Sequence, residues 1–393
     1  MGRPKIRFEG YSEDWEQRKL IDYLEVSSEK NRDNRFTKED VLSVSGEYGI
    51  VNQIEFQGRS FAGASVSNYG VVENGDVVYT KSPLKSNPYG IIKTNKGIPG
   101  IVSTLYAVYK PKEITDSKFV QIYFELDSRM NSYMHPLVNK GAKNDMKVSA
   151  ENALKGMVSF PKKDEQEMIS LYFSTLDNLI TLHQRKYDET KTLKKYMLQK
   201  MFPQNGEKVP EIRFDGFTED WEQRKLGNIT VKIGSGKTPS GGKSAYVETG
   251  IPLIRSQNVN GDKVDFADIV FVDETTDESM ANSRVYTNDV LLNITGASIG
   301  RSAVYKGLES ANVNQHVCII RPTEGYQPDF IQLNLSSDNG QKQIDASQAG
   351  GGREGLNFQE IGKMQFCFPS LNEQKCIGRY FNSLDHFITL HQR

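Results

Sequence analysis

The strongest constraint on the fold of this chain is a fifteen-residue sequence that occurs twice. Residues 6–20 read IRFEGYSEDWEQRKL and residues 212–226 read IRFDGFTEDWEQRKL, with twelve identical positions. A second pair, FSTLDNLITLHQR at 173–185 and FNSLDHFITLHQR at 381–393, shares nine of thirteen positions. Because the two offsets are 206 and 208 residues, one unit of about two hundred residues is used twice. The segments between the matched pieces hardly match, so we expect a duplicated framework that presents two different surfaces at a fixed separation.

The composition limits the class of protein. A chain of 393 residues is long enough for two domains with separate cores, in agreement with the repeat. It has no run of eighteen apolar residues and no apolar segment near the N-terminus, so we predict neither a membrane span nor a secretory signal. The three cysteines are odd in number and not at metal-ligand spacing, which is typical of reduced thiols in a cytoplasmic protein.

The charge balance is informative when it is divided between the two inserts. A net charge of −1 is not typical of a protein that binds nucleic acid alone. Residues 26–160 hold 17 Lys and Arg against 14 Asp and Glu, whereas residues 227–368 hold 12 against 16. Any DNA contact therefore has to use a local patch, and we expect a partner to supply much of the positive field.

The clearest predicted element is a helix over about residues 164–201. Acidic residues begin it, lysines lie near its end, and Pro161 and Pro203 flank it. A second predicted helix at about 373–393 repeats its first half and stops at Arg393. We expect the two helices to pack as an antiparallel pair, and the alternative is that each covers only its own domain. The distal half of the first helix would lack a full-length partner, so extending the second helix with a copy of residues 186–203 is expected to raise thermal stability.

Both inserts read as α/β segments rich in strands. Residues 72–81 and 286–295 each combine a short turn with an apolar run, and residues 97–111 and 311–322 read as strands that end at Lys-Pro or Arg-Pro. Each insert then closes with a Gly-containing loop and a final strand. We therefore expect the same fold in both inserts, with different surfaces, and a helix after each.

No catalytic motif stands out. GSGKT at 234–238 resembles a phosphate-binding loop, but the position five residues before Gly236 is Val231 rather than the required Gly. NPYG at 87–90 lacks the second Pro of the NPPY tetrad of amino-methyltransferases, and no Gly-rich cofactor loop accompanies it. The five histidines show no metal-binding spacing. We predict no catalytic, cofactor or metal site in this chain.

The remaining candidates are polar and basic side chains in predicted turns. Arg can make two hydrogen bonds to guanine, and Asn or Gln can make two to adenine, in the major groove. Any one such residue is more typical of a solvated surface, but their clustering on loops favours the set. In the first insert the predicted DNA-contact residues are Lys81, Lys85, Asn87, Lys93, Lys96, Lys140, Lys143 and Asn144. In the second insert they are Lys237, Arg255, Ser256, Gln257, Asn258, Asn293, Thr295, Ser298, Arg301, Asn314, Gln315 and Arg353.

Together these features resemble the specificity subunit of a Type I restriction-modification system. The similarity rests on the double WEQRKL segment (15–20 and 221–226), IPLIRSQNV (251–259), LLNITGASIGR (291–301), NVNQHVCIIRP (312–322), REGLNFQEIGKMQFCFP (353–369) and the helix openings at 165–177 and 373–385. It covers essentially the whole chain. The resemblance implies an α/β (α+β) fold with two pseudo-twofold-related target recognition domains. Each would be followed by a long helix, and the helices would form an antiparallel coiled-coil pair.

The resemblance also divides the chain into six segments. The expected recognition domains are residues 26–161 and 227–369, and the expected helices are 162–203 and 370–393. The repeated framework segments are then 1–25 and 204–226.

The same resemblance implies a non-catalytic subunit. Each recognition domain would read one half of an asymmetric bipartite DNA site, and the helices would set the spacer. The implied partners are double-stranded DNA, two modification subunits that methylate adenine with S-adenosylmethionine, and possible restriction subunits that use ATP and magnesium. No cofactor is expected in this chain, and the implied location is the prokaryotic cytoplasm, at the nucleoid through DNA. The predicted partner-contact residues are Trp15, Leu20, Trp221, Leu226, Leu176, Ile180, Leu384 and Ile388.

Two other classes of function stay open at the level of sequence. A stand-alone methyltransferase or nuclease would bind a cofactor or turn over alone, which the missing motifs disfavour. A two-headed scaffold on a coiled-coil stalk would show no sequence-dependent DNA binding, which the unlike inserts disfavour.

Overall fold

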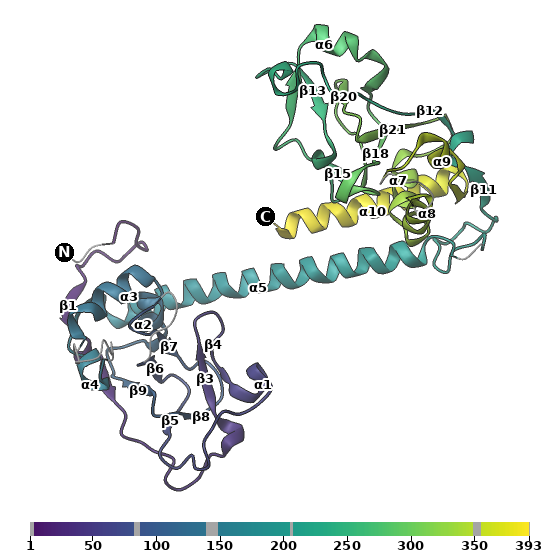
Figure 1. Ribbon diagram of the computed structural model, residues 1–393. Coiled ribbons are helices and arrows are strands. Elements are labelled where there is room, and N and C mark those ends of the chain that lie inside the picture. Colours follow the sequence, from purple (N-terminus) through teal and green to yellow (C-terminus); the bar gives the residue numbers. More distant parts are fainter. Residues whose placement is uncertain (1–3, 82–86, 139–147, 205–206, 349–354, 393) are drawn as a thin grey trace. The chain divides into compact units, whose positions relative to one another are not determined.

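The computed structural model describes residues 4–81, 87–138, 148–204, 207–348 and 355–392. The chain forms two compact units, unit 1 (Met1–Thr181) and unit 2 (Leu182–Arg393). The helix α5 (Lys163–Lys200) runs through the boundary between them (Figure 1). Each unit combines strands with helices, so the predicted mixed α/β (α+β) class is confirmed.

Unit 1 is built on a four-stranded antiparallel sheet in the order β2-β9-β6-β7. Its strands are β2 (Leu24–Val26), β6 (Val77–Thr80), β7 (Ile92–Thr94) and β9 (Tyr106–Pro111). The pair β5 (Gly70–Val72) with β8 (Gly100–Val102) and the hairpin β3 (Leu42–Ser45) with β4 (Gly49–Asn52) complete the strands of this domain core. The helices of the domain are α1 (Gln53–Gln57), α2 (Ser117–Phe124), α3 (Asp127–Met134) and α4 (Ala150–Ala153).

The central strand β6 shows why its sequence is apolar throughout. Side chains alternate between the two faces of a strand, so Val77 and Tyr79 point one way and Val78 the other. Val77 and Tyr79 belong to the core that includes Phe119 of α2, and Val78 packs in a second cluster with Val108 of β9. Because both faces of the sheet are covered, a continuous apolar run replaces the alternating pattern of a half-exposed strand.

Unit 2 contains two four-stranded sheets and a small hairpin. One sheet has the order β12-β21-β18-β19, from β12 (Thr230–Ser235), β18 (Val290–Asn293), β19 (Ser302–Val304) and β21 (Val317–Pro322). The other has the order β16-β13-β20-β17, from β13 (Ile251–Ile254), β16 (Val270–Val272), β17 (Arg284–Val285) and β20 (Ala311–Val313). The hairpin is β14 (Val259–Asn260) with β15 (Lys263–Val264). The helices are α6 (Glu274–Ser279), α7 (Pro328–Ser336), α8 (Asp338–Gln348), α9 (Phe358–Lys363) and α10 (Leu371–Gln392).

The two units share one strand topology. In the sheet β2-β9-β6-β7, β9 lies between β2 and the hairpin strand β6. In the sheet β12-β21-β18-β19, β21 lies likewise between β12 and the hairpin strand β18. Val41 bridges Ile101 in parallel in unit 1, just as β13 pairs with β20 in parallel in unit 2. The prediction that the two inserts have the same fold is confirmed by this strand order. They differ in one connection, because a tight turn leads from β3 to β4, whereas the hairpin β14-β15 separates β13 from β16.

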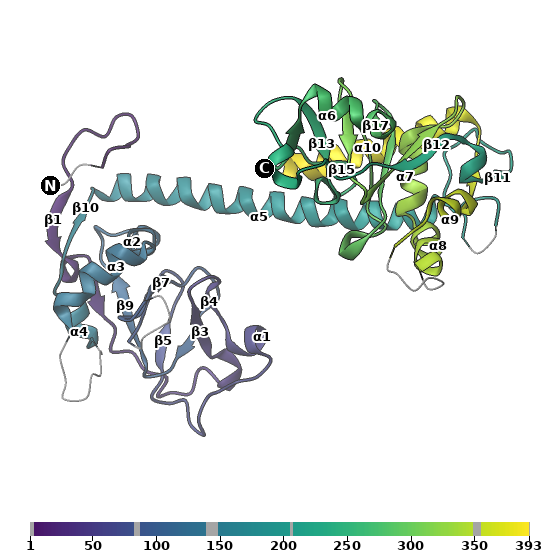
Figure 2. The same ribbon diagram turned by 45° about the horizontal axis from the view of Figure 1, so that its top comes forward.

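The repeated WEQRKL segment closes each domain with the same strand pair. β1 (Glu16–Lys19) pairs antiparallel with β10 (Met157–Phe160) in unit 1. β11 (Glu222–Lys225) pairs with β22 (Gln365–Phe368) in unit 2, in the equivalent register. Thus the duplicated sequence encodes the strand that joins the start of each domain to its end. Figure 2 shows this for β1 and β10.

An ion pair repeats this closure on the following helix. Arg7 Nε lies 2.6 Å from Glu165 Oε1 of α5, and Arg213 Nε lies 2.6 Å from Glu373 Oε1 of α10. The glutamate side chains are almost fully buried, at 2% and 1% exposure. A buried carboxylate is costly unless it is paired and hydrogen-bonded. The repeated arginine therefore fixes the framework segment onto the helix of its own unit.

Three predicted partner-contact residues require a correction. Leu20, Trp221 and Leu226 are at most 1% exposed and lie in the hydrophobic cores of their own units. The framework strand places them inward, so they stabilise the domain and are not available to a partner. Trp15 is half-buried against Phe119, with ring centroids 5.8 Å apart.

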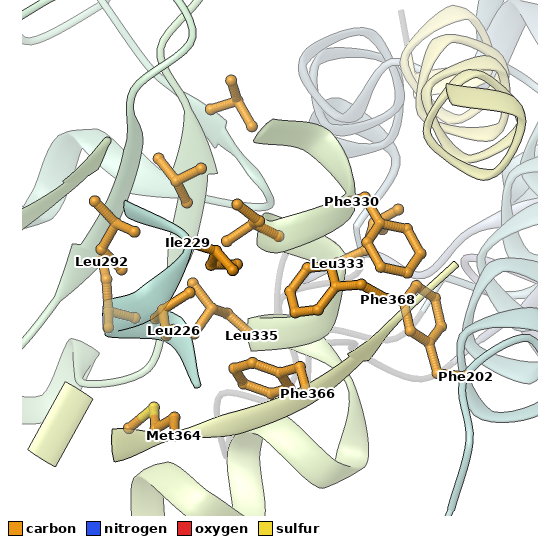
Figure 3. Packing of buried hydrophobic residues seen from close by; sticks show 14 of the residues in the cluster. Phe202, Leu226, Ile229, Leu292, Phe330, Leu333, Leu335, Met364, Phe366 and Phe368 are labelled. Atoms are coloured by element: carbon orange, nitrogen blue, oxygen red, sulfur yellow. The ribbon is translucent and has the colours of Figure 1, made fainter. Parts of the chain in front are cut away.

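The core of unit 2 gathers aromatic side chains from distant segments. Phe202, which follows α5, stacks on Phe330 of α7 with ring centroids 5.3 Å apart. Phe330 also contacts Trp221 and Phe368, at 5.5 and 5.7 Å. Figure 3 shows Phe330 and Phe368 next to each other, and Phe366, Leu226 and Leu335 in the same cluster. The end of α5 is therefore anchored in the core of unit 2.

Within unit 2, α10 lies antiparallel to the last part of α5 (Figure 1). His183 and His391 face each other with Nδ1 atoms 2.9 Å apart, and Lys194 Nζ lies 2.5 Å from Asp385 Oδ1. Residues later in α5 therefore contact residues earlier in α10, which confirms the predicted antiparallel pairing. The expectation that the distal half of α5 would lack a full-length partner is wrong, because α10 packs against that half. Leu384 is 7% exposed in this packing, and Ile388 is half-buried. Ile180, at the equivalent position of α5 in unit 1, is 67% exposed.

Candidate nucleic-acid interface

Four loops of unit 2 meet at one edge of its sheets. The antiparallel register places the ends of β12 and β18 beside the start of β21, because Ser235 pairs with Cys318 and Asn293 with Val317. The parallel strands β13 and β20 end at the same edge. We call the residues that follow these strands, 236–239, 255–258, 294–301 and 314–316, the loop edge.

Backbone and side-chain hydrogen bonds connect the four loops directly. Gly236 N donates to Asn314 O at 3.3 Å, and Asn314 N donates to Ile254 O at 3.2 Å. Ile294 N donates to His316 O at 3.0 Å. Most of the DNA-contact residues predicted in the second insert therefore come together on one surface. They are Lys237, Arg255, Ser256, Gln257, Asn258, Thr295, Ser298, Arg301, Asn314 and Gln315, with Asn293 directly beneath.

Several of these polar side chains hold the loops in place. Asn258 is 2% exposed, accepts from Arg255 N at 3.0 Å and donates to the carbonyls of Asp265 and Asp268. Asn293 is fully buried and donates to Ser256 O at 2.8 Å. Both side chains are buried and their amide nitrogens donate to backbone carbonyls, so these two residues shape the surface and do not reach a ligand.

Asp268 restrains two further candidates. Arg255 Nη2 donates to Asp268 O at 2.6 Å, and Gln257 Nε2 donates to the Asp268 carboxylate. An acidic side chain at this point reduces the positive potential that Arg255 offers to a phosphate. Arg255 and Gln257 therefore bind an anion less readily than their exposure alone would indicate.

The Gly-rich turn after β18 projects Arg301 from the loop edge. Gly296 and Gly300 have φ angles of +71° and +85°, which glycine adopts readily. Gly300 N donates to Asn293 O at 3.0 Å, and a Cβ at Gly300 would lie 2.8 Å from Gln341 Oε1. The turn thus requires glycine at this position. Arg301 remains exposed, with a 3.3 Å hydrogen bond from Nη1 to Asn260 Oδ1.

The sequence reading missed two residues of the loop edge, Thr238 and His316. His316 Nδ1 lies 2.5 Å from Thr295 Oγ1, and its Nε2 lies 3.1 Å from Gln315 Nε2. Thr238 donates to Gln315 Oε1. A lone histidine and a lone threonine carry no signal of their own, since only the strand register brings their loops together.

Unit 1 has a corresponding edge, but those of its predicted residues that the structure describes do not come together there. Lys81 follows β6 and donates to Thr104 O at 2.7 Å, so it lies where the loop edge of unit 2 has residues 294–301. Burial lowers the pKa of Lys81, and the neighbouring Lys30 lowers it further. Lys96 follows β7, which runs antiparallel to β6, and so lies at the opposite end of the sheet. Lys81 and Lys96 therefore cannot form one surface.

Two other predictions in unit 1 are corrected by burial. The Lys93 side chain is 6% exposed, and its Nζ lies 2.7 Å from Glu125 Oε1. Asn87 is 6% exposed and donates to Asp127 Oδ1 at 2.9 Å. Both side chains serve the packing of the domain. The remaining candidates, Lys85, Lys140, Lys143, Asn144 and Arg353, lie outside the described residues.

The chain is similar to specificity subunits of Type I restriction enzymes. The Type I restriction modification DNA specificity domain matches residues 218–393. Over 316 residues the chain is 23% identical to the Type I restriction enzyme MjaVIII specificity subunit of Methanocaldococcus jannaschii, covering 78% of this chain and 72% of that protein. Residues 218–393 thus match the specificity domain of Type I restriction-modification systems, and most of the chain is similar to Type I specificity subunits.

The chain is also similar to two further specificity subunits. The chain is 30% identical over 172 residues to the EcoBI specificity subunit of Escherichia coli, covering 42% of this chain and 35% of that protein. The crystal structure of the S subunit from M. genitalium superposes with a TM-score of 0.55 at 14% identity, covering 99% of this chain and 94% of that one. At such low identity the superposition shows a common fold.

The described residues contain neither a membrane-spanning helix nor a group of metal ligands. Within the ranges that the structure describes, no helix is long and apolar enough to cross a membrane. In the same part of the chain, no three His, Cys, Asp or Glu side chains are grouped so that they could hold a metal ion.

Proposed function

We propose that this chain is a specificity subunit that reads a bipartite, asymmetric DNA site, with one half-site for each domain. The observation that carries the proposal is the pairing of one strand topology with two unlike edges. Unit 2 presents a hydrogen-bonded loop edge with amide and guanidinium groups, whereas the corresponding edge of unit 1 presents Lys81 and Lys30. A shared scaffold with different loops suits two readers of different sequences.

The second part of the proposal concerns the catalytic partners. The chain is taken to be non-catalytic and to dock two modification subunits, which bind S-adenosylmethionine and methylate adenine in each half-site. Restriction subunits that use ATP and magnesium would join the same assembly in the prokaryotic cytoplasm. Support comes from the similarity to specificity subunits and from the modest charge of −1, which leaves much of the DNA-binding field to partners.

The third part assigns the spacer to α5. This helix has 38 residues, and at 1.5 Å per residue it is about 57 Å long. It is continuous from the last strand of unit 1 to the core of unit 2. A helix of fixed length is a suitable ruler for the non-specific gap between half-sites.

Methylation mapping tests the proposed function. DNA from cells that express this chain with its modification subunit would be sequenced by a long-read method that detects methylated adenine. We expect paired methylation on opposite strands of a split asymmetric motif, absent from cells without this chain. A stable complex that produces no motif would contradict the proposal and favour a scaffold.

A further inference from the structure

Four side chains from three loops of the loop edge form one hydrogen-bonded row. Thr238 follows β12, Gln315 and His316 follow β20, and Thr295 follows β18. Thr238 donates to Gln315 Oε1, the Gln315 amide nitrogen lies 3.1 Å from His316 Nε2, and His316 Nδ1 lies 2.5 Å from Thr295 Oγ1. No residue in this row is adjacent in sequence to a residue on another loop, so the row exists only in the folded domain.

The direction of these hydrogen bonds follows from the number of protons available. A neutral imidazole has one ring proton, so one nitrogen donates and the other accepts. The Gln315 amide nitrogen is a donor, which makes His316 Nε2 the acceptor and leaves the ring proton on Nδ1, facing Thr295 Oγ1. The reverse direction requires the Gln315 amide to turn over. His316 therefore couples the orientation of the Gln315 amide to its own tautomer.

The backbone of His316 is fixed independently of its ring. Its N–H donates to Asn314 Oδ1 at 3.1 Å, and its carbonyl accepts from Ile294 N at 3.0 Å. The imidazole is half-buried, whereas the Gln315 side chain is exposed. His316 is therefore the inner residue with little conformational freedom, and it restrains the amide of the exposed Gln315.

Gln315 differs in this respect from the other amides of the loop edge. Asn258 and Asn293 are buried and committed to backbone carbonyls, and Gln257 donates to Asp268. Gln315 uses one oxygen lone pair for Thr238 and one amide proton for His316. One N–H and one lone pair remain, and these are the two groups with which Gln recognises the N7 and N6 atoms of adenine.

We propose that Gln315 reads an adenine in the half-site of unit 2, and that His316 is a positioning residue that fixes the face of its amide. This inference rests on the proposed function and names the base class that one side chain selects. Holding the amide in advance reduces the rotamer freedom lost on binding, which favours discrimination between bases. Thr238 restrains the amide from the other side.

The test measures base preference rather than activity alone. The full chain, assembled with its modification subunits, would methylate a plasmid library in which every position of both half-sites varies. We expect Gln315→Ala to lower the preference for A·T at one position about 10-fold or more, with the other positions unchanged. Gln359→Ala is the matched control, because Gln359 is an exposed glutamine on α9. It is expected to keep the wild-type profile.

The positioning role has its own variants. His316→Ala and Thr238→Val are expected to weaken the base preference at the same position as Gln315→Ala. Thr238→Ser is expected to keep the wild-type preference, because its hydroxyl can still donate to Gln315. A purely structural defect would instead lower methylation of all sites alike, and an unfolded variant would show a lowered melting temperature. If His316→Ala leaves that position unchanged while Gln315→Ala affects it, the positioning role is overturned.

Failure of the inference can be separated from failure of the proposed function. A wild-type complex with a clear bipartite motif, combined with a Gln315→Ala variant of identical base preference, would overturn the inference and leave the proposed function intact. Equal loss at every position in Gln315→Ala would overturn it as well. A wild-type complex that methylates without any motif would overturn both.

Discussion

Arg255 and Arg301 lie on the same edge of unit 2 but are held differently. Arg255 donates to the Asp268 carbonyl at 2.6 Å and lies near its carboxylate, whereas Arg301 is exposed and makes a 3.3 Å hydrogen bond to Asn260. An arginine that is already paired has less to gain from DNA. Of these two residues, Arg301 is therefore the better candidate for a contact with guanine or phosphate.

Replacing Arg301 is expected to separate binding from stability. Arg301→Ala should slow methylation of sites with the correct unit 2 half-site about 10-fold, because one base or phosphate contact is lost. The melting temperature should stay within about 2 °C of wild type, since an exposed side chain is removed. Initial methylation rates and thermal denaturation measure the two effects, with Arg379→Ala on α10 as an exposed control. A wild-type rate in Arg301→Ala would remove this residue from the contact set.

Lys194 of α5 stabilises unit 2 through two ion pairs. Its Nζ lies 2.5 Å from Asp385 of α10 and 2.8 Å from Asp262 of the β14-β15 turn, and its side chain is 13% exposed. Burial alone would lower the pKa of Lys194, but the two carboxylates outweigh burial and raise the pKa. Burial raises the pKa of Asp385, and one lysine shared by two acids offsets only part of that rise. The cluster thus joins the helix pair to the recognition domain with an excess of negative charge.

Removing this lysine should destabilise unit 2. Lys194→Ala leaves two carboxylates without their cation and is expected to cost about 2 kcal/mol, a discounted value because Asp385 is 39% exposed. Asp385→Asn should cost less, since one carboxylate then suffices for the lysine. Because the folded pKa of Lys194 is raised, its contribution is present below its ordinary pKa of 10.5 and is lost as pH rises through the folded pKa. Denaturant unfolding at pH 7 of both variants measures the difference. Equal losses would contradict this account.

At the level of elements, α5 and α10 show the same residues in two environments. Phe381 of α10 is 1% exposed, whereas the equivalent Phe173 of α5 is 43% exposed. In unit 2 the last turns of α5 cover the α10 face, because Met201 and Phe202 pack with Phe381 and Leu384. Comparison of the two repeats thus shows that the end of a helix such as α5 covers this apolar face when it packs against it.

Appending a copy of residues 186–203 after Arg393 is therefore expected to raise the melting temperature. The added helix would offer its copies of Met197, Leu198 and Met201 to Phe173 and Ile180, and burial of apolar area stabilises the folded state. The control is the same extension with serine at those three copied positions, which keeps its length but has no apolar face. Thermal denaturation distinguishes them, and equal melting temperatures for both extensions and wild type would contradict the prediction.

The elements were easier to predict than the surfaces. The long helix was expected at about 164–201 and spans Lys163–Lys200, because helical periodicity and end charges are local signals. The common fold of the inserts followed from the repeated framework. In contrast, Lys93 looked like a surface cation until Glu125 and burial neutralised it, and Leu20 looked like a contact until the core enclosed it. Whether such a side chain is exposed or buried depends on contacts between segments far apart in sequence. No local pattern in a single sequence indicates those contacts.

On the loop edge, some residues were predicted from the sequence and others were missed. Gln315 and Arg301 were predicted because polar residues after apolar runs indicate loops at strand ends. Their partners Thr238 and His316 were missed, since only the register of β12, β18 and β21 joins these loops. The sequence therefore predicted which residue types lie on the loop edge, and the structure shows which of them are restrained by neighbouring side chains.

At the scale of the whole molecule, the proposed function makes the gap between half-sites depend on the length of α5. If α5 sets the gap between half-sites, seven residues inserted after Asp177 should lengthen the preferred gap. Seven residues add about 10 Å, close to three base pairs at 3.4 Å each, and turn the helix face by only about 20° from two full turns. A seven-residue substitution of equal length in the same region is the control. Methylation of a library with gaps of every length measures the shift, and a complex that keeps the original gap or accepts all gaps equally would exclude α5 as the ruler.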